Sequence, residues 1–203
     1  SSAFFGNALK NEFKGIPAIV CGAGPSLSKD IKELSKLDNR GLIFAAGSAI
    51  TALTNKGVFP HFGVAVDPNF NEYHRLKASQ AFQTPIFYLN RSHPHIFKTF
   101  NGPHGYLQTM TGGRAELWME KKLGLEGELL QEGLDLEALS VTTIAVQLAA
   151  TLGCNPIILS GVDLALTDNK SYTSGIEAQD KVSLDKLKQN MRVSEKLLKR
   201  KDI

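Results

Sequence analysis

Apolar segments of strand length alternate with segments of helical periodicity along this chain, and this alternation constrains its fold more than any other feature. The apolar segments are Ile16–Cys21, Leu42–Ala46, Phe62–Val66, Ile86–Asn90 and Pro156–Ser160, with a further strand expected near Tyr106–Thr109. Helical patterns occupy Ser28–Leu37, Ser48–Lys56, Asn71–Phe82 and Val141–Leu152. Such alternation is typical of a mostly parallel sheet with helices on both faces. We therefore predict an α/β fold, a three-layer Rossmann-like domain.

The 203 residues, 42% of them hydrophobic, suffice for one large domain with its own core. We interpret residues 1–203 as that domain, and the abrupt start and charged end suggest that it was excised from a longer protein. Residues 91–139 break the alternation and are expected to form a less regular insertion. The polar segment Gly161–Gly175 is flanked by glycine, which predicts a loop. Val141–Leu152 is apolar almost all round, which predicts a buried helix.

The charge balance argues against nucleic acid as a partner, because 23 basic and 20 acidic residues leave a net charge of only +3. The basic excess lies mainly in Lys181–Lys201, which predicts a helix with a solvated basic face. No apolar run reaches transmembrane length and no signal peptide is present, so we expect a cytoplasmic chain without a membrane partner. Cys21 and Cys154 lie in apolar contexts and are predicted to be buried free thiols.

Three turns join strands to helices: Gly22–Leu27, Gly47–Ser48 and Ser140–Thr143. In open parallel sheets, ligands bind beyond the carboxyl ends of the strands, where helix N-termini suit phosphate. Glycine lets backbone approach a ligand closely, while Ser and Thr add hydroxyl donors. The serines at positions 28, 48 and 140 equally suit helix N-caps, and the pattern leaves both interpretations open.

The first two turns lack residues that are typical of dinucleotide-binding sites, and this limits which nucleotide can be expected. The Gly22–Leu27 turn begins like a dinucleotide fingerprint, but Leu27 stands where Gly or Ala is expected. The second strand ends in Ala45-Ala46-Gly47, without the acidic residue that holds an adenosine ribose. NAD is therefore not expected, and the absence of a Walker A sequence excludes a P-loop ATPase.

Two carboxylates, Asp67 and Asp163, directly follow apolar strands. A carboxylate there can accept from a ribose hydroxyl, hold hydrated Mg²⁺ or act as a base. Asp67-Pro68 is also ordinary turn chemistry, so a purely structural role stays open. The five histidines show no spacing typical of a metal site or a nucleophile, and most are expected at the surface. His93 and His95 lie in a loop that is expected to overhang the site.

Together the motifs Gly22–Leu27, Ala45–Ser48, Val66–Pro68, Ser140–Thr143 and Ser160–Ala165 resemble the MptE-like family. That family includes the central domain of the Maf motility accessory factors and the archaeal 6-hydroxymethylpterin diphosphokinases. Each motif is short, but their order and spacing together are fairly specific, and the resemblance runs over about residues 14–172, most of the chain.

A more distant similarity is to bacterial CMP-sialic acid transferases, in which a comparable Gly-x-Gly-Pro-Ser-Leu turn contacts the nucleotide. Gly161, Asp163 and Tyr172 occupy places that match those enzymes, and the matching tyrosine lies near the leaving phosphate. This sequence lacks their downstream histidine base, since no His follows His104. Leu136–Leu139 stands where they carry an arginine before the Ser-Val-Thr helix, so the resemblance covers the nucleotide-binding positions and not this arginine or the histidine base.

These resemblances imply a Maf-type glycosyltransferase that uses a CMP-activated nonulosonic acid such as sialic or pseudaminic acid, needs no cofactor and modifies a protein such as flagellin. The implied catalytic residues are Asp67, Asp163 and Tyr172. The implied nucleotide-binding residues are Gly22, Gly24, Pro25, Ser26, Leu27, Gly47, Ser48, Asp67, Ser140, Thr142, Thr143 and Gly161. One alternative is an ATP:6-hydroxymethylpterin diphosphokinase with Mg²⁺ held by Asp67 or Asp163. Another is a catalytically silent nucleotide-binding module.

Overall fold

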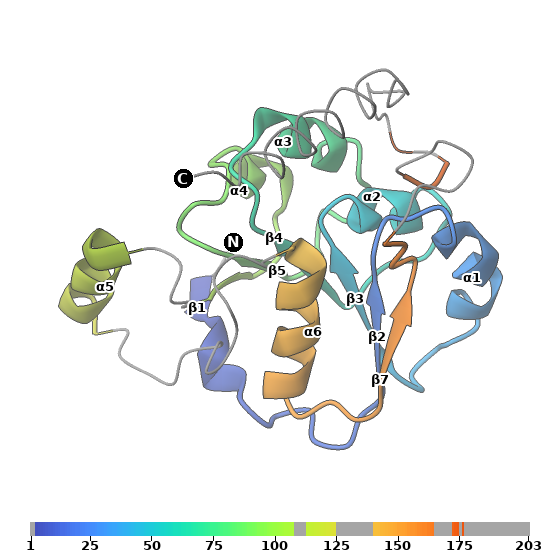
Figure 1. Cartoon of the computed structure of the whole chain (residues 1–203), viewed down its shortest axis with the longest axis horizontal. Coiled ribbons are helices and arrows are strands. Elements are labelled where there is room, and N and C mark those ends of the chain that lie inside the picture. The colour runs from blue at the N-terminus through green and yellow to red at the C-terminus, as the bar shows by residue number, and fades with distance from the viewer. Residues whose placement is uncertain (1–2, 108–112, 125–139, 165–171, 175, 177–203) are drawn as a thin grey trace, which may run out of the picture.

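Seven parallel strands form one sheet in the computed structural model, which describes residues 3–107, 113–124, 140–164, 172–174 and 176. In chain order they are β1 (Ala3–Phe5), β2 (Ala18–Cys21), β3 (Leu42–Ala46), β4 (Phe62–Ala65), β5 (Ile86–Tyr88), β6 (His104–Tyr106) and β7 (Ile157–Ser160). Across the sheet the order is β1-β6-β5-β4-β3-β2-β7 (Figure 1). The predicted parallel sheet is confirmed.

Helices cover both faces of this sheet. They are the 3-10 helix η1 (Gly6–Leu9) and the α-helices α1 (Leu27–Leu34), α2 (Ala49–Thr54), α3 (Phe70–Leu76), α4 (Ile96–Thr99), α5 (Gly113–Lys122) and α6 (Val141–Thr151). Alternate residues of β2 enter two separate cores: Ile19 and Cys21 pack with α1 to α4, whereas Ala18 and Val20 pack with α6. This period of two confirms the three-layer α/β fold.

Helix α6 lies on one face of the sheet in Figure 1, roughly alongside the strands, and is buried along the side that faces them. Ile144, Ala145, Leu148 and Ala149 form that face, while Val141 and Val146 are only partly buried. The sequence pattern therefore predicted burial correctly for the sheet side of the helix but overestimated it for the other side.

Several element boundaries differ from the sequence prediction. Helix α1 begins at Leu27, so Ser28 lies inside it and is not its N-cap. Helix α3 was expected to run to Phe82 but ends at Leu76. At this observed end the Thr51 hydroxyl donates to the Arg75 carbonyl at 2.7 Å, which connects the end of α3 to α2.

The strand expected near Tyr106–Thr109 begins earlier, at His104. Its register is fixed by pairing with β5, which sets His104 opposite Ile86 and Tyr106 opposite Tyr88. Because β6 is an internal strand between β1 and β5, His104 is buried, and it is the exception among five histidines that were mostly expected at the surface.

Parts of other predictions lie outside the described residues. Residues 91–139 contain α4, β6 and α5 in the portions that are described. The predicted basic helix Lys181–Lys201 and residues 165–171 of the predicted loop are not among the described ones. In the portion of the chain that is described, no helix has the length and apolar character needed to cross a membrane.

Both cysteines are buried free thiols, as predicted. Cys21 ends β2 in the core, and this burial raises the pKa of its thiol to about 12. Burial also raises the pKa of Cys154.

Candidate functional site

A cavity of about 410 Å³ lies beyond the carboxyl ends of β2, β3 and β4. This is the position at which open parallel sheets bind ligands, and the volume suits a small organic molecule. The residues that line it come from six separate segments of the chain: Ala23, Ala46, Ser48, Val66, Asp67, Pro68, Glu72, Arg75, Arg91, Ser140, Val141, Thr142 and Tyr172.

The structure brings together only some of the residues predicted from the sequence. Those that line the cavity are Ser48, Asp67, Ser140, Thr142 and Tyr172. Those that do not line it are Gly22, Gly24, Pro25, Ser26, Leu27, Gly47, Thr143, Gly161 and Asp163. The Ser140–Thr143 turn therefore contributes side chains to the cavity lining, whereas none of the residues predicted in the Gly22–Leu27 turn does. The difference follows from the contacts that each turn makes.

The Gly22–Leu27 turn packs against the end of β7. The backbone N–H groups of Gly22 and Gly24 donate to the carbonyls of Ser160 and Gly161, each at 2.8 Å. A Cβ at position 22 would lie 2.6 Å from the Gly161 carbonyl oxygen, so only glycine permits this approach. The missing side chain thus serves the contact between two turns of the protein.

Asp163 occupies the space above the same turn. Its Oδ2 accepts from the Ser26 N–H at 2.7 Å, and a Cβ at Gly24 would lie 2.5 Å from that oxygen. Hydrogen bonds from Ser26 hold the pKa of the Asp163 carboxyl below its ordinary value. In this structure a carboxylate of the chain itself therefore takes up a donor at the start of α1.

The serines before α6 and α2 have different roles. Ser140 is a true N-cap, since its hydroxyl accepts from the Thr143 N–H at 3.1 Å. Ser48 precedes α2 but makes no capping hydrogen bond. Its hydroxyl instead joins a buried charged network on the floor of the cavity.

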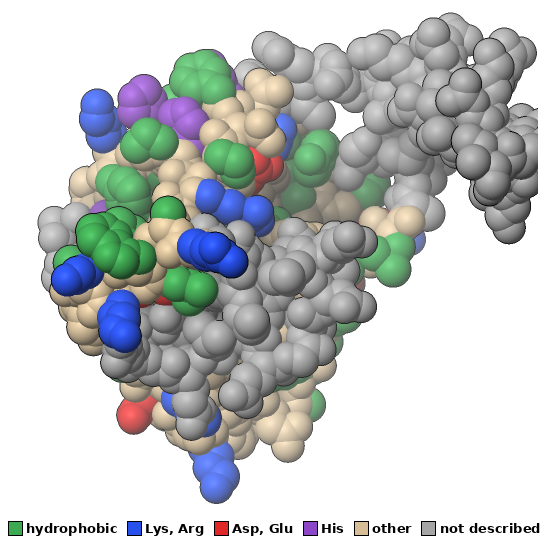
Figure 2. Space-filling view, turned by 60° about the vertical axis from the view of Figure 1, so that its left-hand side comes forward, with side chains coloured by type: hydrophobic (Ala, Val, Ile, Leu, Met, Phe, Trp, Pro, Cys, Tyr) green, Lys and Arg blue, Asp and Glu red, His purple; other side chains and the backbone are tan. Residues whose placement is uncertain are grey.

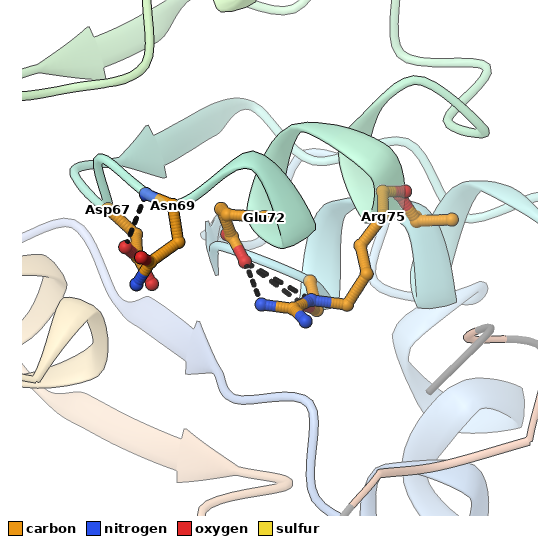
Figure 3. Close-up of polar contacts among 6 residues, drawn as sticks. Asp67, Asn69, Glu72 and Arg75 are labelled. Atoms are coloured by element: carbon orange, nitrogen blue, oxygen red, sulfur yellow. Dashed lines mark hydrogen bonds and ion pairs between the residues drawn. The ribbon is translucent and has the colours of Figure 1, made fainter. Parts of the chain in front are cut away.

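That network is the ion pair between Glu72 and Arg75 (Figure 3). Arg75 Nη2 lies 2.7 Å from Glu72 Oε2, and Nε donates to the Ser48 hydroxyl at 2.8 Å. The side chains are only 17% and 6% exposed for Arg75 and Glu72, respectively. Burial raises the pKa of the Glu72 carboxyl, against the opposing effect of the Arg75 hydrogen bond.

Gly47 makes room for this carboxylate. Its φ is +52°, a left-handed conformation that favours glycine, and a Cβ there would lie 2.6 Å from Glu72 Oε1. On the other side of the network, the Arg75 guanidinium lies 5.5 Å from the centre of the Tyr172 ring, within cation–π distance. Glycine, carboxylate, guanidinium and phenol ring therefore form one continuous packed unit.

Asp67 combines the two roles that the sequence left open, a structural role in a turn and a position at the candidate site. Its Oδ1 accepts from the Asn69 N–H at 2.9 Å, which is the turn contact drawn in Figure 3, and the residue also lines the cavity. Arg91 is exposed and lines the cavity from the loop after β5. Within the described residues, no group of three or more His, Cys, Asp or Glu is placed to hold a metal ion.

His93 and His95 lie in an aromatic cluster beside the cavity and do not line it. The His93 ring stacks on Tyr73 with centres 5.5 Å apart, and Phe70 lies 5.6 Å from His93. Figure 2 shows histidine and hydrophobic side chains gathered together on this face. The sequence predicted that their loop overhangs the site, but neither histidine lines the cavity, and the two rings pack against Tyr73 and against each other.

Sequence reasoning did not identify Glu72, Arg75 or Arg91. Glu72 and Arg75 are three residues apart in a predicted helix, a spacing that places them on one helix face. That signal was available, but the same spacing is common in solvated surface pairs.

The family described as 6-hydroxymethylpterin diphosphokinase MptE-like matches residues 4–169, most of the chain. The chain belongs to the MptE-like family. The resemblance found in the sequence motifs is thereby confirmed, and Gly22–Leu27, Asp67 and Asp163 all fall inside the matched region.

A solved Maf glycosyltransferase from Magnetospirillum magneticum AMB-1 is similar in structure to this MptE-like chain. The TM-score is 0.59 at 20% sequence identity, covering 78% of this chain and 25% of that one. The similarity shows a shared fold, and the chain spans about a quarter of the glycosyltransferase. Among curated proteins, no match is found.

Proposed function

We propose that this MptE-like chain is the nucleotide-binding part of a transferase whose donor is a nonulosonic acid activated by CMP. The observation that carries the proposal is the composition of the cavity: an aspartate, two arginines and several hydroxyls at the carboxyl edge of the sheet. These groups suit a ligand that combines phosphate with ribose hydroxyls. Family membership and the fold shared with a Maf glycosyltransferase support a transfer reaction.

In this proposal some cavity residues act on the departing CMP and others act on the acceptor hydroxyl. The acceptor hydroxyl forms a bond to the anomeric carbon as the bond from that carbon to the phosphate oxygen breaks. CMP departs with the electron pair, and Tyr172 donates toward its phosphate. Asp67 takes the proton of the acceptor hydroxyl, because Glu72 is already paired with Arg75. Fixed donors around a departing charge commonly supply the largest catalytic effect.

The second candidate is a diphosphokinase that transfers diphosphate from ATP to a pterin alcohol, and the description of the matching family favours it. Such transfer uses Mg²⁺, which proteins hold with one or two carboxylates together with the phosphates of the substrate. Asp67 fits this role because it faces the cavity, whereas Asp163 is bonded to Ser26 outside the cavity lining. The metal would neutralise phosphate oxygens during transfer.

Thermal unfolding of the full chain with CMP, CDP, ATP, AMP and GDP, each with Mg²⁺ or with EDTA, separates these functions. A ligand present at 100 times its dissociation constant adds about 2.7 kcal/mol of stability. We expect CMP to raise Tm by the same amount in Mg²⁺ as in EDTA, and we expect the same independence of metal for CDP. A response to ATP that requires Mg²⁺, without a response to CMP, favours the diphosphokinase.

Two further results would change the assignment. If none of the nucleotides raises Tm, the nucleotide-binding proposal is wrong. If CMP binds but the chain neither transfers nor hydrolyses a CMP-linked sugar, the chain is a silent binding module. Transfer to a protein acceptor such as flagellin is measured by the mass added to that protein.

A further inference from the structure

Arg75 is a mostly buried cation of the cavity lining, and several contacts hold its side chain in place. Glu72 and Ser48 bind its guanidinium on one side, and the Tyr172 ring lies against it on another. The end of its helix is fixed by the hydrogen bond from Thr51 to the Arg75 carbonyl. A guanidinium held in this way loses little further conformational freedom when it binds a ligand.

Its hydrogen-bonding capacity is only partly used. Nε donates to Ser48 and Nη2 donates to Glu72, while Nη1 has no hydrogen-bond partner among the residues that the structure describes. Figure 3 shows this third nitrogen pointing away from Glu72. Because Arg75 lines the cavity, the unused donor is available to an acceptor bound there.

Arg91, the other arginine of the cavity, differs in its support. It is exposed, and within the described part of the chain no hydrogen bond or ion pair holds it. An exposed, unsupported cation gives mainly a screened attraction and loses side-chain entropy on binding. Directional recognition in this cavity is therefore expected from Arg75.

We propose that Arg75 selects the phosphorylated form of the ligand by donating from its guanidinium to a phosphate oxygen, with Glu72 as a positioning residue that fixes its orientation. This inference rests on the proposed nucleotide-binding function and adds the residue that distinguishes a nucleotide from its nucleoside. The Glu72–Arg75 pair is neutral as a whole, so the selection arises from a directed, partly desolvated hydrogen bond.

Isothermal titration of the full chain with a nucleotide and its nucleoside tests this, using CMP with cytidine or AMP with adenosine. Inorganic pyrophosphate is titrated as a separate probe. The quantity of interest is the ratio of nucleotide to nucleoside affinity. We expect Arg75→Gln to lower this ratio about ten- to a hundredfold, the effect of one hydrogen bond to a charged group, with nucleoside affinity unchanged.

Three variants separate charge, geometry and folding. Arg75→Lys keeps the charge but loses the planar fork, so the ratio should fall by an intermediate amount. Glu72→Asp keeps the charge but withdraws the carboxylate from Arg75, so it should lower the ratio without lowering nucleoside affinity. If Arg75→Gln does not fold, the double variant Glu72→Gln/Arg75→Gln avoids an unpaired buried carboxylate and is expected to show the same loss.

Lys77→Ala is the matched control, because Lys77 is an exposed cation at the end of the same helix and outside the cavity lining. It should leave the ratio unchanged. Raising the salt concentration should reduce the effect of Arg91→Ala and leave most of the effect of Arg75→Gln.

The proposal is overturned if the wild type binds nucleoside and nucleotide equally, or if Arg75→Gln lowers both affinities together. In those cases nucleotide binding itself stands. If no nucleotide binds but pyrophosphate does, and Arg75→Gln abolishes that binding, the anion role of Arg75 stands and the nucleotide function fails. If neither nucleotide nor pyrophosphate binds the wild type, both proposals fail.

Discussion

Substituting Gly24 by Ala tests whether the first glycine turn is built for a ligand or for β7. The new Cβ would lie 2.5 Å from Asp163 Oδ2 and 2.8 Å from the Gly161 carbonyl oxygen. The carboxylate can move away, but it then loses its hydrogen bond from the Ser26 N–H. The expected result is a less stable protein that still binds its ligand in the cavity.

The size of the effect follows from these contacts. Removing an acceptor at a helix N-terminus costs about 1 kcal/mol, and this sets the expected cost of Asp163→Ala. Gly24→Ala adds the strain against the Gly161 backbone, which cannot swing aside, so we expect a loss of about 2–3 kcal/mol in the free energy of unfolding. Both substitutions disrupt the same hydrogen bond.

Urea unfolding of the two single variants and the double variant measures this coupling. The double variant should lose about 1 kcal/mol less than the sum of the single losses, which exceeds the scatter of independent sites. Additive losses would contradict the argument. So would a Gly24→Ala protein with unchanged stability and abolished CMP binding, the result expected if phosphate occupied this turn.

The remaining predictions concern single groups. Ser140→Ala should cost about 1 kcal/mol of unfolding free energy, because the Thr143 N–H loses its cap; unchanged urea unfolding would contradict this. Cys21, with its pKa raised to about 12, should resist a thiol reagent at pH 8 in the native state and react on unfolding, whereas rapid native labelling would count against burial. The pKa of the Asp163 carboxyl is lowered in the folded protein from its ordinary value of 3.8. Its contribution to the free energy of unfolding should therefore be complete above pH 3.8 and should be lost as the pH falls through the lower pKa of the folded state. The stability difference between wild type and Asp163→Asn should therefore shrink on acidification, and a constant difference would refute the effect.

The strands were predictable because burial on both sides of a parallel sheet leaves continuous apolar segments. Leu42–Ala46 was predicted with the observed bounds, and the edge at which the ligand was expected is the edge that carries the cavity. Helix ends were less predictable, since α3 stops where Thr51 of another helix binds the Arg75 carbonyl. Such a contact is tertiary and leaves no mark in the local pattern.

The glycine turn shows a different limit of sequence reasoning. The sequence predicted that a ligand approaches the backbone closely at Gly22 and Gly24, whereas the groups that lie close to these glycines in the structure belong to the chain itself. A glycine records that space is needed but not which group fills it. Here the neighbours are the Gly161 carbonyl and the Asp163 carboxylate, which become adjacent only because β7 pairs with β2.

Glu72 and Arg75 were not predicted as site residues for the same reason: a local sequence pattern does not show which distant group lies beside it. Gly47 is the residue that would have indicated their burial. On its own, an acidic and a basic residue three positions apart in a helix indicate an exposed pair of small energetic value. Gly47, with its left-handed backbone, leaves space for the Glu72 carboxylate, and Ser48 directs its hydroxyl to the same pair instead of capping α2. The turn after β3 and the helix after β4 must therefore be considered together, because parallel strands bring their carboxyl ends side by side. A charged pair in the helix after one strand, opposite a glycine and a serine that follow the neighbouring strand, indicates a buried pair beside the ligand edge rather than a surface one.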